Sequence, residues 1–377
     1  MSTAEPASSD PLVTLVHDYL LVMRGAERSF AAIADLYEHA PIFTLLYDEQ
    51  GTDGRFAGRS VTTSPLQRLG VSQENFRRLL PLYPWATGRL ELPASDIVLS
   101  SSSAFAHGVR APAGAVHVCY CYTPFRYAWY ERQRALEETP APLRPALSVA
   151  LRRIRRWDLA ASRRVDVYLA ISELSRERIR RYWGRESTIV HPPVETERFA
   201  PGVPGEKLLV VSEIVRHKRL QVALEAARRA GTPIRVAGAG PDLSELREAY
   251  PEAEFLGRVG DRELAELYAQ ARAVIVPSME EFGITAVEAQ AAGRPVIAAA
   301  AGGALETVLD GVTGRLAALD DIEAFRVAIE GVDGLGLDPA DAVRNAERFS
   351  VAAFRRRISE QVGLALERRR GMQDGAP

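Results

Sequence analysis

Short apolar runs alternate with amphipathic stretches along most of the chain, and this alternation predicts β-strands connected by α-helices. The first apolar run covers residues 12–17, and a helix then extends from the Arg24-Gly25-Ala26 turn to about Tyr37. The further strands expected in the first half are 42–46, 97–99, 116–121, 167–171 and 188–190, and the further helices are 73–80, 143–163 and 173–183. Strands that alternate with helices favour a parallel sheet covered on both faces, as in α/β proteins.

A second unit of the same kind follows. The alternation stops after His191, where prolines and glycines gather, and it restarts at Leu208, which predicts a domain boundary. The strands expected beyond it are 208–211, 234–237, 254–256, 273–276 and 295–298, and the helices are 218–230, 241–249, 261–271 and 284–292. We therefore expect an N-terminal Rossmann-like domain over 12–195, a C-terminal one over 205–345, and a helix over 346–370 that returns to the N-terminal domain. Such domains bind ligands at the carboxyl ends of their strands, so the cleft between them is the expected site.

Composition and charge exclude several classes of protein. The 377 residues are 47% hydrophobic and 25% charged, with a formal net charge of −2, which is typical of a globular protein and not of a disordered chain. No apolar run approaches the roughly 20 residues that a membrane-spanning helix needs. The nearly balanced charge disfavours a general nucleic-acid-binding role. Residues 1–11 lack the basic and apolar regions of a signal peptide, so we expect a cytoplasmic protein whose first residues form a loose tail.

The rare residue types add two observations. Cys119 and Cys121 lie two apart in a predicted strand and share a face with His117, but no second Cys/His pair completes a set of metal ligands. We expect two buried thiols, no metal and a reducing compartment. Of the 47 basic residues, only Lys207 and Lys218 are lysines. This preference for arginine over lysine indicates genomic base composition and not a function. A cluster of arginines is therefore weak evidence for a binding site, whereas a lysine is stronger evidence.

The segment with the densest candidate chemistry is 276–297. A strand is expected to end at Val276, a loop then carries Glu280 and Gly283, and a helix containing Glu288 follows. The glycine would let the backbone approach a ligand, and the first N–H groups of the helix suit an anion. A carboxylate among small residues favours partners such as ribose hydroxyls. The alternative is that Glu288 is a surface residue and Glu280 an ordinary acid at a helix start.

This segment resembles the retaining glycosyltransferases of family 4, which have the GT-B fold. Glu280 and Glu288 have the E-x7-E spacing of that family, within Glu-Glu-Phe-Gly-Ile and Val-Glu-Ala-Gln-Ala-Ala-Gly-Arg-Pro-Val-Ile. Residues 257–259, 301–307 and 236–241 resemble its LGRV turn, GGxxE loop and GxGP turn. Residues 119–126 and 16–20 are similar to a mannosyltransferase-like subgroup. The resemblance covers residues 12–360.

The resemblance implies two Rossmann-like domains facing across a cleft, with a nucleotide-sugar donor on the C-terminal domain and the acceptor mainly on the other. The donor would be GDP-mannose, and the acceptor a glycan, a lipid-linked glycan or a polysaccharide precursor. Glu288 would bind the ribose, Glu280 the transferred sugar, and Lys218 the leaving diphosphate, with further contacts from Phe282, Gly283 and Ile284. The chemistry would retain anomeric configuration, with no metal and no cofactor beyond the nucleotide-sugar co-substrate. The sequence contains no D-x-D, in keeping with that mechanism.

Two positions depart from the family pattern. Glu213 stands where the family often has a phosphate-binding arginine. Tyr122 stands where it often has a histidine before Thr-Pro that contacts the sugar at the reaction centre. The resemblance thus implies three catalytic residues, Glu280, Lys218 and Tyr122. We expect Glu213 to pair with Arg216 or Arg219, or to hold Lys218 while one of these arginines contacts the phosphate. The alternative function is therefore a non-catalytic GT-B paralogue that serves as a binding or scaffold subunit. A GT-B nucleotide-sugar epimerase is disfavoured by the E-x7-E context.

Two further features concern the N-terminal domain. Gly25 in the first turn and Arg126 after Thr-Pro are expected substrate contacts, although an ordinary strand-to-helix turn fits Gly25 equally well. Within residues 143–166, an apolar helical stripe is flanked by Arg152, Arg153, Arg155, Arg156, Arg163 and Arg164. They would suit the anionic headgroups at the inner face of the plasma membrane, and a solvated helix face is the alternative.

Overall fold

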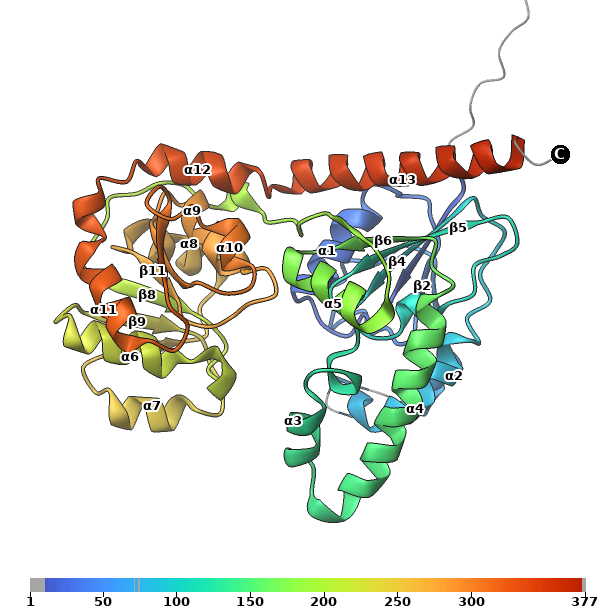
Figure 1. The fold of residues 1–377 in the computed structure, drawn as a ribbon, viewed down its shortest axis with the longest axis horizontal. Helices are drawn as coiled ribbons and strands as arrows, with labels where there is room; N and C mark the ends of the chain where they lie inside the picture. The colour runs from blue at the N-terminus through green and yellow to red at the C-terminus, as the bar shows by residue number, and fades with distance from the viewer. Residues whose placement is uncertain (1–10, 71, 74, 375–377) are drawn as a thin grey trace, which may run out of the picture. The chain divides into compact units, whose positions relative to one another are not determined.

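The computed structural model describes residues 11–70, 72–73 and 75–374, which divide into two compact units (Figure 1). The first unit contains the described residues up to Ile171, then Ser175–Val190 and the chain from Arg355 onward. The second contains Ser172–Leu174 and His191–Phe354. Residues 1–10, which include most of the tail expected from the sequence, lie outside the described residues.

The described part of the first unit contains a seven-stranded parallel sheet in the order β3-β2-β1-β4-β5-β6-β7. Its strands are β1 Val13–His17, β2 Ile42–Thr44, β3 Val61–Thr63, β4 Ile97–Ser102, β5 Val116–Cys121, β6 Val167–Ala170 and β7 Thr188–Ile189. All residues of β1, β4 and β5 are buried, which explains their nearly continuous apolar sequence, since helices cover both faces of such a sheet. Cys119 and Cys121 are buried and free, as expected.

Helices α1 Gly25–Ala34, α2 Tyr83–Thr87, α3 Arg132–Glu137, α4 Arg144–Ser162 and α5 Glu173–Trp183 complete most of this unit. The long helix α13 spans Val351–Asp374, and its residues from Arg355 onward belong to the first unit (Figure 1). The Arg355 guanidinium binds the carboxylate of Asp35 and the carbonyl oxygen of Ala32. These contacts attach the end of the chain to the region just after α1.

In the second unit, the described residues form a six-stranded parallel sheet in the order β10-β9-β8-β11-β12-β13. The strands are β8 Leu208–Val211, β9 Ile234–Ala237, β10 Glu254–Gly257, β11 Val274–Val276, β12 Val296–Ala299 and β13 Gly314–Ala317. The helices are α6 Leu220–Arg229, α7 Leu243–Ala249, α8 Asp261–Gln270, α9 Ile284–Ala291, α10 Ala304–Thr307, α11 Ile322–Gly331 and α12 Pro339–Glu347. Helix α6 packs against α11, and α9 packs against α8 and α12 (Figure 1). The predicted α/β class with two parallel sheets is confirmed.

A few elements differ from the expectation. Residues 76–82 form a 3-10 turn that contains Pro81, where the sequence pattern suggested an α-helix over 73–80. Strands β3 and β13 were not expected, because both are edge strands of mixed polarity and lack a continuous apolar run. Gly314 in β13 is required by space, since a Cβ there would lie 1.9 Å from the carbonyl oxygen of Val296.

A buried carboxylate organises the carboxyl end of β1 and β4. Asp18, which is 1% exposed, accepts hydrogen bonds from four consecutive backbone N–H groups, those of residues 103–106, at 2.5–2.9 Å. The hydroxyl groups of Ser102 and Ser103 also donate to it. Many donors can hold a buried charge that would otherwise be costly. Asp18 therefore fixes the loop after β4.

Candidate functional site

The candidate donor site lies at the carboxyl ends of β8 and β11, which are neighbours in the sheet of the second unit. The loop after β8 carries Lys218 and the loop after β11 carries Glu280. The Lys218 Nζ atom donates to both Glu280 carboxylate oxygens, at 2.8 and 2.6 Å. The Ser278 hydroxyl donates to the same carboxylate at 2.5 Å. The structure thus brings together two of the three residues expected to be catalytic, with one quarter or less of each side chain exposed.

The shape of the Glu280 loop depends on two glycines of the GGxxE segment. A Cβ on Gly302 would lie 2.3 Å from the carbonyl oxygen of Glu280, and one on Gly303 would lie 2.1 Å from that of Phe282. The Gly303 N–H also donates to the Glu280 carbonyl oxygen at 2.9 Å. Only residues without a side chain permit this close approach. The motif is therefore a backbone support for the loop that presents Glu280.

The N-terminus of α9 faces the same end of the sheet. Gly283 precedes the helix with φ of +91°, a left-handed conformation that favours glycine, and no side chain caps the first turn. Unpaired N–H groups at a helix start attract anions. Phe282 is 3% exposed, and its ring packs on His191 and Phe349, so only its backbone is available to a ligand. His191 in turn contacts the Glu306 carboxylate at 2.9 Å.

Glu288 lies in the second turn of α9 and is partly exposed. Its carboxylate accepts a hydrogen bond of 2.8 Å from the hydroxyl of Tyr268 on α8. Tyr268 is fully buried, and burial raises the pKa of its phenol well above the usual range. The sequence pattern does not connect these two residues, because Tyr268 occupies an apolar position of an amphipathic helix, which is typical of a core residue.

The pairings expected of Glu213 are absent. Glu213 is exposed, Lys218 instead binds Glu280, and Arg219 forms an ion pair with Asp320. Arg219 adopts a left-handed backbone conformation, φ +55°, immediately before α6. Arg216 is exposed. The two arginines therefore lie near Lys218 in sequence, but neither compensates the charge of Glu213.

The GxGP segment packs against the loop that carries Glu213. A Cβ on Gly238 would lie 1.8 Å from the carbonyl oxygen of Ser212, and one on Gly240 would lie 2.1 Å from that of Ile214. The Ile214 N–H donates to the carbonyl oxygen of Ala239 at 3.0 Å. These contacts make both glycines structural supports of the loop after β8.

In the first unit, Tyr122 lies against the start of α1. Its hydroxyl donates to the carbonyl oxygen of Ala26 at 2.8 Å and shares a hydrogen bond of 2.9 Å with Ser101. Burial raises the pKa of this phenol well above its usual range, so it cannot act as a base near neutral pH. The structure thus brings Tyr122 to the Gly25 turn, while Arg126 is exposed, with its guanidinium 5.8 Å from the centre of the Tyr127 ring.

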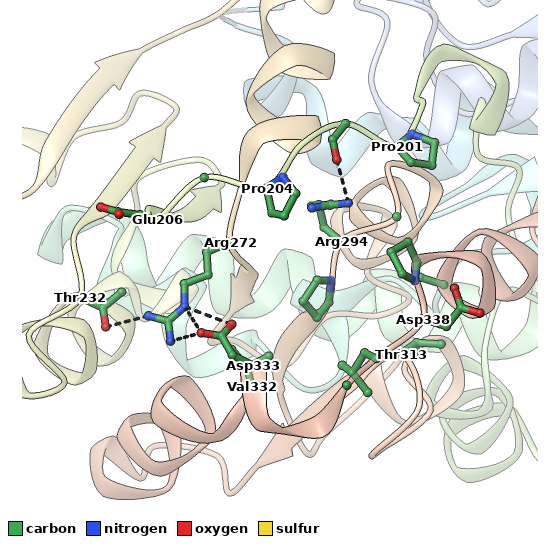
Figure 2. Close-up of a pocket in the computed structure, with 18 of the residues that line it drawn as sticks. Pro201, Pro204, Glu206, Thr232, Arg272, Arg294, Thr313, Val332, Asp333 and Asp338 are labelled. Carbon is green, nitrogen blue, oxygen red and sulfur yellow. Dashed lines mark hydrogen bonds and ion pairs between the residues drawn. The ribbon is translucent and has the colours of Figure 1, made fainter.

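A cavity of about 740 Å³ lies at the amino ends of the strands of the second sheet, opposite the carboxyl ends that carry the candidate donor site (Figure 2). It is lined by linker residues 201–206 and by segments that precede β9, β12 and β13. In its wall, Arg272 pairs with Asp333 at 2.8 Å, and the buried Arg294 donates to the carbonyl oxygen of Gly202 (Figure 2). Arg294 also donates to the carbonyl oxygen of Ala292. Lys218, Glu280 and Glu288 do not line this cavity, so it is separate from the candidate donor site.

Comparisons with known proteins agree with this architecture. The model described as Glycosyltransferase Family 4 matches residues 23–198, and that described as Glycosyl transferases group 1 matches residues 205–332. Among solved structures, Anabaena Alr3699/HepE in complex with UDP has a TM-score of 0.67 and 17% identity, covering 93% of this chain and 99% of its own. Sucrose-phosphate synthase from Thermosynechococcus elongatus has a TM-score of 0.68 and 18% identity, covering 93% and 98%. The chain therefore has the GT-B fold of these structures.

Sequence relatives lead to the same family. The D-inositol 3-phosphate glycosyltransferase of Mycobacterium marinum is 37% identical over 169 residues, 38% of this chain and 36% of that protein. The enzyme of the same name from Mycolicibacterium paratuberculosis is 36% identical over 191 residues, 44% and 43% of the two chains. The matches span less than half the length of these relatives. With both family models covering most of the sequence, the chain belongs to the family 4 glycosyltransferases. The relatives named here do not carry the mannosyltransferase name that the subgroup resemblance suggested.

Glu27 generates a prediction about pH. This third residue of α1 accepts a hydrogen bond from the Arg24 N–H, and burial raises the pKa of its carboxyl from 4.5 to about 7. The folded state therefore binds more protons than the unfolded state between these values, and wild-type stability falls as pH rises through this window. Glu27→Gln keeps the acceptor and removes the ionisation. Between pH 5 and pH 8, the free energy of unfolding of the variant should rise by about 1–2 kcal/mol relative to that of wild type. This value is smaller than the whole pKa shift implies, because Glu27 is partly exposed.

Urea unfolding followed by circular dichroism at several pH values measures this difference. Glu38→Gln, an exposed change just after α1, is the matched control and should leave the pH dependence unchanged. Parallel wild-type and Glu27→Gln curves would contradict the assignment.

Proposed function

We propose that this chain is a retaining, metal-independent glycosyltransferase that moves a hexose from a nucleotide sugar to a glycan, lipid-linked glycan or polysaccharide acceptor. The observation that carries the proposal is the Lys218–Glu280 pair beside the uncapped, glycine-led start of α9. A cation and a helix N-terminus at one point suit a departing diphosphate, because both stabilise negative charge as it develops. Family membership supports the same chemistry.

Each residue then has a defined part. Lys218 neutralises the leaving diphosphate, and the N–H groups of Gly283 and Ile284 receive its oxygens or the sugar hydroxyls. Glu280 holds the transferred sugar while its contact with Lys218 keeps both side chains in place. Glu288 accepts hydrogen bonds from the ribose. Attack on the same face from which the diphosphate departs retains the anomeric configuration, and this route needs no protein nucleophile.

The donor base and sugar are the finer part of the proposal. The subgroup resemblance favours GDP-mannose, whereas Anabaena HepE is described in complexes with UDP and with UDP-glucose. A thermal-shift panel of GDP, UDP, ADP and dTDP sugars separates these donors, because ligand at 100 times its dissociation constant adds about 2.7 kcal/mol of stability. We expect one nucleotide class to stabilise the protein, and its sugar to be released or transferred at an undiminished rate in EDTA. A strict requirement for added divalent metal would refute the metal-free mechanism.

A non-catalytic paralogue is the second candidate, and one observation favours it. The hydroxyl of Tyr122 is occupied by Ala26 and Ser101, at the position where the family often has a histidine. A scaffold subunit would bind a nucleotide sugar in the panel without hydrolysing or transferring it, with or without acceptor.

The two lysines of the chain offer a matched pair of variants. Lys218→Ala removes the proposed diphosphate contact and should lower turnover at least tenfold, a loss of about 1.4 kcal/mol of transition-state stabilisation. Lys207→Ala is the control, because this more exposed lysine pairs with Glu254 and Arg235 also pairs with that carboxylate. Glu288→Ala should instead weaken nucleotide affinity. Steady-state kinetics and calorimetry measure these effects, and equal turnover in both lysine variants would remove Lys218 from the mechanism.

We further propose peripheral contact of the first unit with an anionic membrane through α4. Arg152, Arg153 and Arg156 are exposed beside the exposed apolar residues Leu143 and Val149. Other arginines of the cluster have internal roles, because Arg155 lies 4.3 Å from the Trp129 ring centre and Arg164 donates to the carbonyl oxygen of Gly108. Within the described part of the chain, no helix is long and apolar enough to cross a bilayer.

Vesicle flotation tests the membrane contact. We expect binding to vesicles with anionic lipid, weakened by salt and by changing residues 152, 153 and 156 to glutamate, since each basic residue near such a surface contributes about 1 kcal/mol. The same change at the exposed residues 356, 357 and 368 of α13 is the control. Equal binding to neutral vesicles, or equal loss in both triple variants, would overturn the proposal.

A further inference from the structure

The contact between Tyr268 and Glu288 joins a buried aromatic ring to a carboxylate of the candidate donor site. Tyr268 is fully buried on α8, and its ring meets that of Phe199 edge-on at a centroid distance of 5.4 Å. Its hydroxyl donates to the Glu288 Oε2 atom at 2.8 Å. Helices α8 and α9 pack against each other, so the donor and acceptor of this bond are carried by adjoining rigid elements.

The position of the phenol is fixed, whereas a glutamate side chain alone is not. A partly exposed glutamate has three rotatable bonds and loses conformational entropy when a ligand immobilises it. A hydrogen bond from a locked ring removes part of that cost before the ligand arrives. A carboxylate has about four acceptor positions, so one bond from Tyr268 does not exhaust its capacity.

We propose that Tyr268 is a positioning residue that aims the Glu288 carboxylate at the ribose hydroxyls of a nucleotide, and so determines selectivity for ribose over deoxyribose. This inference rests on the proposed function. Tyr268 acts through Glu288 and does not itself touch the ligand. Burial and the Glu288 carboxylate raise the pKa of the Tyr268 phenol, so the hydroxyl is a hydrogen-bond donor near neutral pH.

A purely structural role makes a different prediction. If the hydroxyl only satisfies its own burial, removing it changes the melting temperature and leaves ligand selectivity unaltered. If the hydroxyl aims Glu288, removing it weakens only the binding that depends on ribose hydroxyls. Tyr268→Phe separates these cases because it keeps the ring on Phe199 and deletes only the hydroxyl, which contacts Glu288 and Thr285.

The experiment uses the nucleoside diphosphate selected by the donor panel, together with its 2′,3′-dideoxy form. Calorimetry gives both dissociation constants for wild type, Tyr268→Phe, Glu288→Ala and the double variant. We expect Tyr268→Phe to lose about fivefold in affinity for the ribonucleotide, the effect of one hydrogen bond, with the dideoxy affinity unchanged. In the Glu288→Ala background, Tyr268→Phe should have no further effect. With the full donor, Tyr268→Phe should raise KM and leave kcat unchanged.

Tyr250→Phe is the matched control, because Tyr250 follows α7 and its ring lies beside the Arg228 guanidinium, away from Glu288. An unchanged ribose-to-dideoxyribose ratio in Tyr268→Phe, or an equal loss for both nucleotides, would overturn the role of Tyr268. Wild type that binds no nucleotide would instead refute the proposed function, so the two failures are distinguishable.

Discussion

The ion pair between Lys218 and Glu280 is the contact on which the candidate donor site depends, because it joins two loops that are 62 residues apart in sequence. Parallel strands place the loops that follow them at one edge of the sheet, and β8 and β11 are neighbours there. The rest of the site supports this contact. Ser278 holds the carboxylate, and the glycine pairs 238/240 and 302/303 let other backbone segments approach the two loops. A side chain at any of these glycines would push a loop away and separate the charges.

The pair also balances charge within the candidate site. With one quarter or less of each side chain exposed, the Lys218 ammonium and the Glu280 carboxylate neutralise one another. The diphosphate of the proposed donor would add negative charge beside this neutral pair, so the N–H groups at the start of α9 would have to stabilise part of that charge.

Most of the fold could be predicted from the sequence. Buried parallel strands such as β5 follow from mainly apolar runs, and Glu280 and Glu288 lie in the loop and the helix that the pattern of residues 276–297 predicted. The edge strands β3 and β13 were not predicted, because their pairing depends on the neighbouring strands and not on a pattern in their own residues. The pairing of Arg219 with Asp320 could not be foreseen, since both residues have left-handed backbones that no periodicity reveals. The proposed role of Tyr268 could not be predicted, because a tyrosine that only packs in the core and one whose hydroxyl positions another side chain look identical in sequence.

The buried Arg294 has a consequence for dividing the chain. Its guanidinium holds the carbonyl oxygen of Gly202, and the Val194 N–H bonds the carbonyl oxygen of Phe349, so the proline-rich linker is folded onto the second unit well before β8 begins. A fragment that begins at Leu208, the start of the first strand of the second unit, would lose one of the two carbonyl partners of the buried Arg294 and one wall of the cavity beside it. For anyone who excises the donor half, or looks for a protease site between the halves, the cut belongs upstream of Val194, although the sequence pattern places the boundary later.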